Sequence, residues 1–183
     1  MKAVFLDRDG TINDHTANYV TSWDQFRFLP NALEALKLLA ESEYKIIVIT
    51  NQTAVRRELM TIEDLQDIHE RMVQAIADAG GRIDWIYACL HLPQDNCKCR
   101  KPKTQMLAKA AEKYDLDLKE SWMIGDNTKD IKCGADAGLK TALVSTGWGG
   151  KDGLFEVSPD VSAVDILEAV RYILDKPKDT VLS

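Results

Sequence analysis

Short continuous runs of hydrophobic residues alternate along this chain with longer segments in which hydrophobic residues recur every three or four positions. The short runs are typical of buried strands, and the periodic segments are typical of amphipathic helices. The runs predict strands at residues 4–6, 46–50, 83–89, 122–124 and 141–144. The periodic segments predict helices around residues 33–39, from 61 to just before 80, and over 104–114, 128–137 and 164–174.

Polar residues and glycines mark several of the expected helix ends. Asn31 stands near the start of the first helix, and Thr61 followed by Asp64 has the spacing of a cap with an acidic first turn. Strands that are separated by helices form parallel sheets with right-handed crossovers. We therefore predict an α/β fold with a doubly wound, Rossmann-like parallel sheet. A single domain would span residues 1–175, and residues 176–183 would form a polar tail.

Composition and charge narrow the class of protein. The chain has 183 residues and is 45% hydrophobic, which is enough for a sizeable core. A net charge of −6 and a sequence pI of about 5.1 argue against nucleic acid or an anionic membrane as a partner. No hydrophobic run is long enough to span a bilayer, and the first strand begins too early to leave room for a signal peptide. We therefore expect a monomeric protein in the reducing cytoplasm.

Two carboxylates one residue apart follow the first predicted strand directly. Asp7 and Asp9, with Gly10 after them, should lie at the carboxyl edge of the sheet, where open α/β sheets carry their chemistry. Like charges this close repel unless a cation lies between them or one acid is protonated. The pair suits Mg²⁺, which prefers carboxylate and carbonyl oxygens, together with a nucleophile and an acid. Taken alone, the motif is equally consistent with a solvated Asp-Gly turn.

Other predicted strands also end in polar groups, and their order is informative. The second strand ends in Thr50, the basic residues at 100–103 include Lys101, and the fourth strand runs into Gly125 and Asp126. An aspartate, a threonine, a lysine and a closing Gly-Asp, in this order on successive βα units, resemble the haloacid dehalogenase superfamily of phosphohydrolases. The resemblance covers residues 4–148, which is most of the chain.

The resemblance implies a phosphatase that forms an aspartyl phosphate. Asp7 would be the nucleophile, and Asp9 would protonate the leaving oxygen and then activate water. Thr50 and Lys101 would contact the transferring phosphoryl group. The implied magnesium ligands are Asp7, the backbone carbonyl of Asp9, Asp126 and, close by, Asn127. The segments between the strands are too short for a large cap domain, so small loops would close the pocket.

A segment rich in cysteine carries the strongest metal signal in the chain. Cys89 and His91 are two residues apart, as are Cys97 and Cys99, and such pairs point the same way in extended backbone. Three thiolates and one imidazole form a closed tetrahedral zinc set that leaves no position for water, so the site would be structural. The alternatives are disulfides, which a reducing compartment disfavours, and incidental cysteines. A zinc loop at residues 89–99 would aim the adjacent basic residues into the site.

The Cys-x-His…Cys-x-Cys-Arg-Lys-Pro element is similar to the zinc-bearing branch of the superfamily, whose members act on a heptose 1,7-bisphosphate or on histidinol phosphate. A bisphosphate calls for extra cations in the pocket, whereas the amine of histidinol phosphate calls for carboxylates. Arg56 and Arg57 favour the phosphorylated sugar, with histidinol phosphate as the alternative. Asn127 stands where the heptose enzymes often have lysine.

Residues expected to bind the substrate come from several segments. Gly10 would let the backbone approach phosphate because it has no Cβ. His69 and Cys133 are interpreted as structural, His69 as a solvated or core-edge side chain. The expected substrate-binding residues are Gly10, Thr16, Ala17, Asn18, Tyr19, Asn51, Gln52, Thr53, Arg57, Arg100 and Asn127.

A different class of protein uses similar residues. Phosphoacceptor signalling domains also combine acids, Mg²⁺, a threonine and a lysine on a parallel sheet. Their phosphorylated aspartate follows the third strand, whereas here the third strand ends at Cys89 and the acids follow the first. A catalytically silent, zinc-stabilised binding module is disfavoured by the complete Asp, Thr, Lys and Asp set.

Overall fold

A computed structural model describes residues 1–15 and 19–175 of the chain. Its strands are β1 (Ala3–Leu6), β2 (Lys45–Asn51), β3 (Trp85–Cys89), β4 (Trp122–Gly125), β5 (Lys140–Val144) and β6 (Val161–Ala163). Its α-helices are α1 (Ala32–Ala40), α2 (Thr53–Arg56), α3 (Ile62–Asp78), α4 (Gln105–Tyr114), α5 (Thr128–Asp136) and α6 (Ile166–Asp175). Two short 3₁₀ helices are η1 (Trp23–Gln25) and η2 (Pro93–Asp95).

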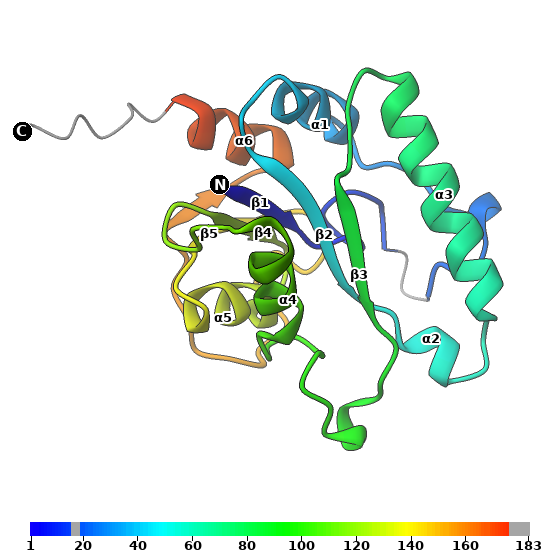
Figure 1. Ribbon diagram of the computed structural model, residues 1–183. Helices are drawn as coiled ribbons and strands as arrows, with labels where there is room; N and C mark the ends of the chain where they lie inside the picture. The colour runs from blue at the N-terminus through cyan, green and yellow to red at the C-terminus, as the bar shows by residue number, and fades with distance from the viewer. Residues whose placement is uncertain (16–18, 176–183) are drawn as a thin grey trace, which may run out of the picture.

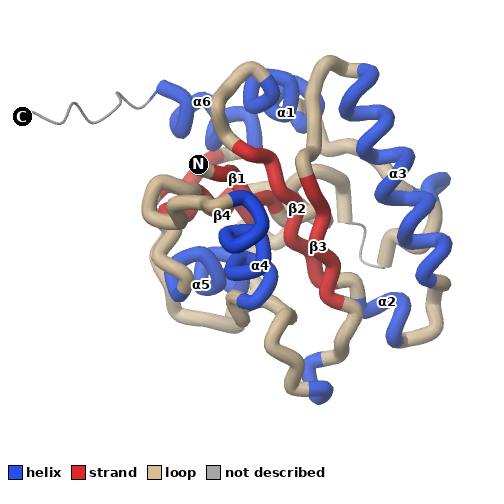
Figure 2. The backbone as a smooth tube through the Cα atoms, in the orientation of Figure 1, coloured by secondary structure: helices blue, strands red, loops and turns tan. Residues whose placement is uncertain are grey.

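The strands form one parallel sheet in the order β3-β2-β1-β4-β5-β6 (Figure 1). Side chains alternate between its two faces along each strand. In β1, Val4 and Leu6 enter the core beneath α1, α3 and α6, while Ala3 and Phe5 enter the core beneath α4 and α5. The helices therefore cover both faces of the sheet (Figure 2), which confirms the prediction of a doubly wound α/β fold.

The five predicted strands are present, and β6 was not predicted from the sequence. This strand has only three residues and pairs with β5, where Ala142 lies opposite Val161. Three residues are too few to show a hydrophobic periodicity. The strand conformation of this segment depends on the neighbour with which it pairs. The last helix begins at Ile166, two residues later than expected.

The two predicted helix caps have different outcomes. Thr61 and Asp64 form a reciprocal capping box, in which each side chain accepts a hydrogen bond from the backbone N–H of the other. Asn31 occupies the N-cap position of α1, as predicted, but its side chain makes no capping hydrogen bond to the helix. Its backbone lies in the left-handed region, and its amide donates a 2.7 Å hydrogen bond to Asp165 instead. Asn31 thus ties the start of α1 to the start of α6.

The carboxyl edge of the sheet gathers the segments that carry the candidate chemistry. β1, β2, β3 and β4 all end at this edge because they are parallel. The connection from β3 to α4 contains η2 and extends away from the sheet there (Figure 1). Within the described part of the chain, no helix has the length and apolar character needed to cross a membrane.

Candidate active site

Lys101 binds the predicted nucleophile at the end of β1. Its ammonium group lies 2.8 Å from the Asp7 carboxylate and 2.8 Å from the Asp130 carboxylate, and it donates a 2.8 Å hydrogen bond to the carbonyl of Ile49. The ammonium group thus has two carboxylates and one backbone carbonyl as close neighbours. Lys101 is buried, and although burial disfavours its charge, the carboxylates of Asp130 and Asp7 raise its pKa above the ordinary value. The nucleophile is thus held by a permanently charged group.

Three carboxylates gather at this point. Asp7, Asp126 and Asp130 are buried, and each offers an oxygen within 4.8 Å of the others. Burial, and then the charges of Asp7 and Asp130, raise the pKa of Asp126 to about 8. Burial and the charge of Asp7 also raise the pKa of Asp130 to about 6, despite the nearby Lys101.

This cluster fits a hard divalent cation. Carboxylate oxygens are the ligands that Mg²⁺ prefers, and a divalent ion would relieve the repulsion that raises the pKa of Asp126. Asp130 also has structural partners, because it accepts a hydrogen bond from the backbone N–H of Asn127 at the start of α5 and contacts Lys101. Asp7 and Asp126 each keep one carboxylate oxygen, Oδ2 and Oδ1 respectively, for which the described residues provide no hydrogen bond or ion pair and which could bind a metal ion.

Two glycines make room for Asp126. The backbone N–H of Trp148 donates a 2.7 Å hydrogen bond to Asp126, and a Cβ on Gly10 or Gly147 would overlap this carboxylate. Both glycines have positive φ, of 86° and 56°, which is strained for other residues. Gly10 is thus required by the close approach of Asp126, whereas the sequence analysis assigned its missing Cβ to contact with phosphate.

Arg8, a residue that the sequence analysis did not select, holds Asp9. The Arg8 guanidinium is buried and donates to Oδ1 of Asp9 from Nε at 3.2 Å and from Nη2 at 2.8 Å. Asn13 donates to the same oxygen at 3.0 Å, and Gln52 donates to Oδ2 at 2.7 Å. Burial opposes ionisation of Asp9, but the charge and hydrogen bonds of Arg8, with those of Asn13 and Gln52, lower its pKa overall.

The residues at the end of β2 hold other residues of the site in place through their side-chain amides. Thr50 is buried at the cleft and accepts a 2.8 Å hydrogen bond from Gln52. Asn51 accepts from the backbone N–H of Lys101 and donates to its carbonyl. Asn51 and Gln52 were expected to bind the substrate. In the structure their amides hold Lys101, Thr50 and Asp9, and Asn51 also lines the cleft.

The four predicted zinc ligands meet in space. Cys89, His91, Cys97 and Cys99 form one group, in which neighbouring sulfur and Nδ1 atoms lie 3.1–3.7 Å apart. Zn–S bonds of about 2.3 Å give tetrahedral edges of roughly 3.8 Å, so the donor set fits a zinc ion closely. All four cysteines in the chain are free thiols. The fourth, Cys133, is buried in the core beneath α4 and α5, as predicted.

The cysteine cluster is connected to the carboxylates through adjacent residues. Arg100 follows Cys99, and its backbone N–H points to the sulfur of Cys97 at 3.4 Å. The next residue is Lys101, whose ammonium group contacts Asp7. A metal ion that holds this loop would therefore constrain Lys101 directly.

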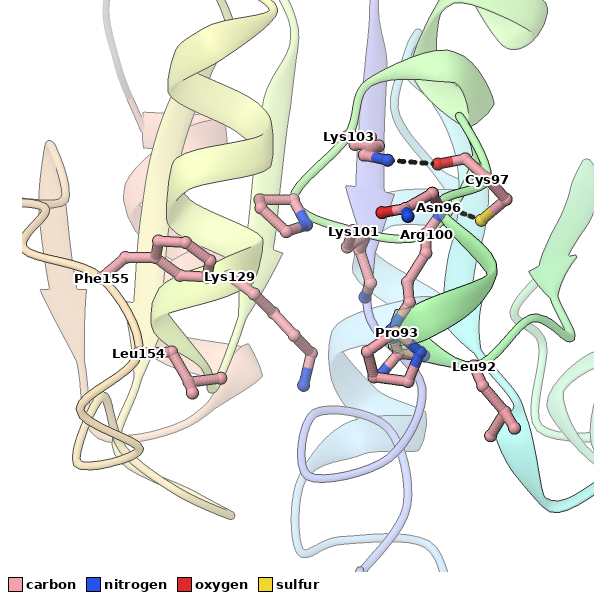
Figure 3. A pocket seen from close by; sticks show the side chains of 11 residues that line it. Leu92, Pro93, Asn96, Cys97, Arg100, Lys101, Lys103, Lys129, Leu154 and Phe155 are labelled. Atoms are coloured by element: carbon pink, nitrogen blue, oxygen red, sulfur yellow. Dashed lines mark hydrogen bonds between the residues drawn. The ribbon is translucent and has the colours of Figure 1, made fainter. Parts of the chain in front are cut away.

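Two neighbouring hollows open at this edge. The first, of about 80 Å³, is the catalytic cleft, and the second, of about 330 Å³, lies between the cysteine loop and the segment after β5. Lys129 lines both, and Figure 3 shows its side chain extending from α5 toward the loop that carries Arg100. The catalytic cleft is lined by Asp7, Asp9, His15, Thr50, Asn51, Asp126, Asn127, Lys129 and Trp148.

The expected substrate-binding residues are dispersed. Arg100 lines the larger hollow, and Asn127 lines the cleft while it caps α5. Thr53 is buried at the start of α2, whereas Tyr19 and Arg57 are exposed and line neither hollow. The expected contacts of residues 16–18 (Thr16, Ala17 and Asn18) fall outside the described residues.

A parallel sheet with a nucleophile-like aspartate after β1, a threonine after β2, a buried lysine and an aspartate after β4 defines a phosphohydrolase of the haloacid dehalogenase class. Residues 98–169 match the family described as HAD-hydrolase-like. A D-glycero-β-D-manno-heptose-1,7-bisphosphate 7-phosphatase of Bordetella bronchiseptica is 38% identical over 151 residues, which cover 82% of this chain and 84% of that protein. The corresponding enzyme of Helicobacter pylori strain J99 is 38% identical over 146 residues, covering 79% and 83%.

A comparison with solved structures points to the same family as these relatives. The crystal structure of D,D-heptose 1,7-bisphosphate phosphatase from B. bronchiseptica, complexed with magnesium and phosphate, matches with a TM-score of 0.88 and 35% identity, over 95% of this chain and 98% of that one. The chain belongs to the family of heptose-1,7-bisphosphate 7-phosphatases. This confirms the predicted superfamily and the preference for its heptose branch.

Proposed function

We propose that this chain is a Mg²⁺-dependent phosphatase that removes the 7-phosphate of D-glycero-D-manno-heptose 1,7-bisphosphate. The observation that carries the proposal is the environment of Asp7. Its carboxylate lies at the floor of the cleft, is bound to Lys101, and stands beside a second carboxylate, Asp126. A nucleophilic carboxylate must meet a negatively charged phosphate, and the fixed charge of Lys101 reduces the repulsion between them.

The reaction has two displacement steps on the same phosphorus. In the first, an oxygen of Asp7 bonds to phosphorus, the bond from phosphorus to the sugar oxygen breaks, and Asp9 gives that oxygen a proton. In the second, water attacks the aspartyl phosphate and gives its proton to Asp9, which releases inorganic phosphate and restores Asp7. Thr50 and Lys101 contact the phosphoryl oxygens during both steps.

Residues of this chain would hold the metal ion that the reaction needs. Asp7, the backbone carbonyl of Asp9 and Asp126 would bind Mg²⁺, with Asn127 close by. When bound, the ion supplies positive charge that offsets the repulsion between carboxylate and phosphate. The magnesium and phosphate in the related B. bronchiseptica structure support this assignment. Cys89, His91, Cys97 and Cys99 would hold a structural zinc ion.

The larger hollow favours a second phosphate over an amine. Arg100, Lys103 and Lys129 contribute cations to its lining, and none of the described residues that line it is acidic. The Lys129 ammonium group makes no close ion pair or hydrogen bond among the described residues; its charge acts on Asp126 and Asp130 from a distance, and it lines the hollow where an anion would bind. Histidinol phosphate would place its amine among these cations. We therefore assign the 1-phosphate of the sugar to Arg100 and Lys129.

A paired assay tests this assignment. Phosphate release is measured with the heptose 1,7-bisphosphate and with histidinol phosphate, each with and without Mg²⁺. We expect turnover of the bisphosphate only with Mg²⁺ and a much lower kcat/KM for histidinol phosphate. A higher kcat/KM for histidinol phosphate would overturn the substrate, and a stable phosphoprotein without turnover would instead indicate a signalling domain. Free cysteine thiols are typical of proteins in a reducing compartment, and we propose that this protein acts in the cytoplasm. We also propose that it is a monomer.

A further inference from the structure

His69 connects helix α3 to the end of β1 through Arg8. Its Nε2 atom lies 3.2 Å from Nη1 of Arg8, and the two residues are 61 positions apart in the sequence. The Arg8 side chain is almost completely buried, with 1% of its surface exposed. A buried guanidinium needs partners for its N–H groups, because leaving them unpaired is costly. His69 was expected to be a solvated or core-edge side chain. In the structure it is also a partner for the buried guanidinium of Arg8.

The chemistry of this contact fixes the state of the imidazole. A guanidinium group can only donate hydrogen bonds, so Nε2 of His69 must accept. The ring is then neutral, with its proton on Nδ1. Burial, and then the charge of Arg8, lower the pKa of His69 to about 4, which agrees with a neutral ring.

Arg8 transmits this contact to Asp9. Its Nε and Nη2 atoms donate to Oδ1 of Asp9 at 3.2 and 2.8 Å, while Nη1 faces His69. With Asn13 as a third donor, Oδ1 is fully occupied, and Oδ2 accepts only from Gln52. Because three donors occupy Oδ1, the proton that Asp9 transfers must be carried by Oδ2. The guanidinium is planar and rigid, so losing the His69 contact at Nη1 allows the whole group to rotate and to release Oδ1.

We propose that His69 is a positioning residue, which holds Arg8 so that Oδ2 of Asp9 faces the reacting oxygens. The proposal rests on the proposed acid-base role of Asp9. His69 itself does not contact the cleft, since it is absent from the residues that line it. Its loss should therefore slow proton transfer without changing the sites for metal or substrate.

Leaving-group dependence distinguishes this role from a general structural one. The sugar alkoxide is a poor leaving group that needs a proton from Asp9, whereas p-nitrophenolate leaves without one. For His69→Leu we expect kcat/KM for the heptose bisphosphate to fall about tenfold, a fraction of the roughly 10²–10⁴-fold that general acid–base catalysis contributes. With p-nitrophenyl phosphate, kcat/KM should change by less than about twofold, because that leaving group needs no acid.

Two amide variants test the position of the acceptor. Gln places its side-chain oxygen near the position of Nε2, whereas the shorter Asn reaches only the position of Nδ1. We expect His69→Gln to recover most of the activity toward the bisphosphate, and His69→Asn to resemble His69→Leu. The comparison of Gln with Asn remains valid if the leucine variant fails to fold. Glu70→Leu, an exposed change on the same helix, is the control for effects on α3.

The outcomes separate this inference from the proposed function. Equal losses for the two substrates, equal activities of the Gln and Asn variants, or no loss in any His69 variant would each overturn the role of His69. Asp9→Asn is assayed in parallel, and it should show a larger loss with the same dependence on leaving group. If Asp9→Asn keeps normal turnover of the bisphosphate, the proposed role of Asp9 fails first.

Discussion

The side chain of Asn51 hydrogen-bonds both backbone groups of Lys101. Its Oδ1 accepts from the Lys101 N–H at 3.1 Å, and its Nδ2 donates to the Lys101 carbonyl at 3.3 Å. The end of β2 is thereby attached to the segment that follows the cysteine cluster. The Lys101 ammonium group, fixed by this backbone attachment, reaches Asp7 at the end of β1.

Replacing Lys101 should reduce both activity and stability. Lys101→Met removes the charge beside Asp7, and we expect turnover of every phosphate ester to fall by about 10²–10³. It also leaves Asp7 and Asp130 buried without their counter-ion, which should lower the unfolding free energy by about 3–5 kcal/mol. Steady-state kinetics and denaturant unfolding measure the two effects. Unchanged kinetics with p-nitrophenyl phosphate would contradict the contact with the transferring group.

Replacing the nucleophile should remove the covalent step. Asp7→Asn keeps the shape of the side chain but lacks a carboxylate oxygen to attack phosphorus, so turnover should fall by about a thousandfold or more. Rapid acid quenching of the wild-type enzyme should trap an aspartyl phosphate that is absent from the variant. Near-normal turnover by Asp7→Asn would rule out this nucleophile.

The metal-free carboxylate cluster should make stability depend on pH. Burial and then the charges of Asp7 and Asp130 raise the pKa of folded Asp126 to about 8, far above that of an unfolded aspartate. The folded state therefore binds more protons than the unfolded state below about pH 8, and its unfolding free energy decreases as pH rises toward that value. Without Mg²⁺, the advantage of Asp126→Asn over wild type in Tm should be larger at pH 8.5 than at pH 6.5.

Magnesium should reverse this trend, because it binds the ionised carboxylates and competes with protons. The increase in wild-type Tm on adding Mg²⁺ should be larger at pH 8.5 than at pH 6.5, and it should be lost in Asp126→Asn. Thermal unfolding of protein freed of magnesium by dialysis, without a chelator that would strip zinc, measures these differences. A Tm difference between variant and wild type that does not change with pH would contradict the raised pKa of Asp126.

The cysteine cluster predicts one tightly bound zinc ion per chain. Cys97→Ala should lose the ion, lower Tm and weaken substrate binding, because the binding energy of a structural zinc is also folding energy. Cys133→Ala removes the one cysteine outside the cluster and should retain the zinc. Elemental analysis of proteins purified without chelator makes the comparison. Wild-type protein without zinc would contradict the site.

Replacing Arg100 or Lys129, the cations that we assign to the 1-phosphate, should affect turnover of the bisphosphate selectively. A charge-assisted contact contributes about 1.5–3 kcal/mol, so Arg100→Ala or Lys129→Met should each reduce kcat/KM for the bisphosphate by roughly ten- to a hundredfold. Both variants should keep kcat/KM for p-nitrophenyl phosphate within about twofold, since this ester has no second phosphate.

Lys132→Met is the matched control for the cations of the larger hollow. Lys132 lies on the same helix as Lys129, but it is paired with Asp136 and lines neither the cleft nor this hollow. Its replacement should leave the kinetics of both substrates unchanged. A Lys129→Met variant that loses activity equally toward both esters would contradict the assignment of Lys129 to the second phosphate.

Local patterns in the sequence were sufficient to predict the main features of the fold and to select the candidate reacting groups. The hydrophobic runs located five of the strands because four of them are mostly buried, while β3, at the edge of the sheet, is only partly buried but still forms a continuous hydrophobic run. Asp7 and Asp9 could be placed at the carboxyl edge because they directly follow such a run. The spacing of Cys89, His91, Cys97 and Cys99 predicted a single cluster because all four residues lie within eleven positions of one another.

The tertiary structure alone decided how these groups are supported. Arg8 and His69 are 61 positions apart, and Asn51 and Lys101 are 50 apart, so neither contact leaves a periodic or spacing signal in the sequence. Lys129 joins the two hollows because α5 begins opposite the cysteine loop, and a Cβ at Gly147 would overlap Asp126, which is distant in the sequence. The sequence by itself determined which groups we propose to react, since their chemistry and order are local. The packing of distant segments determined how each group is held, which depends on distances that only the folded chain sets.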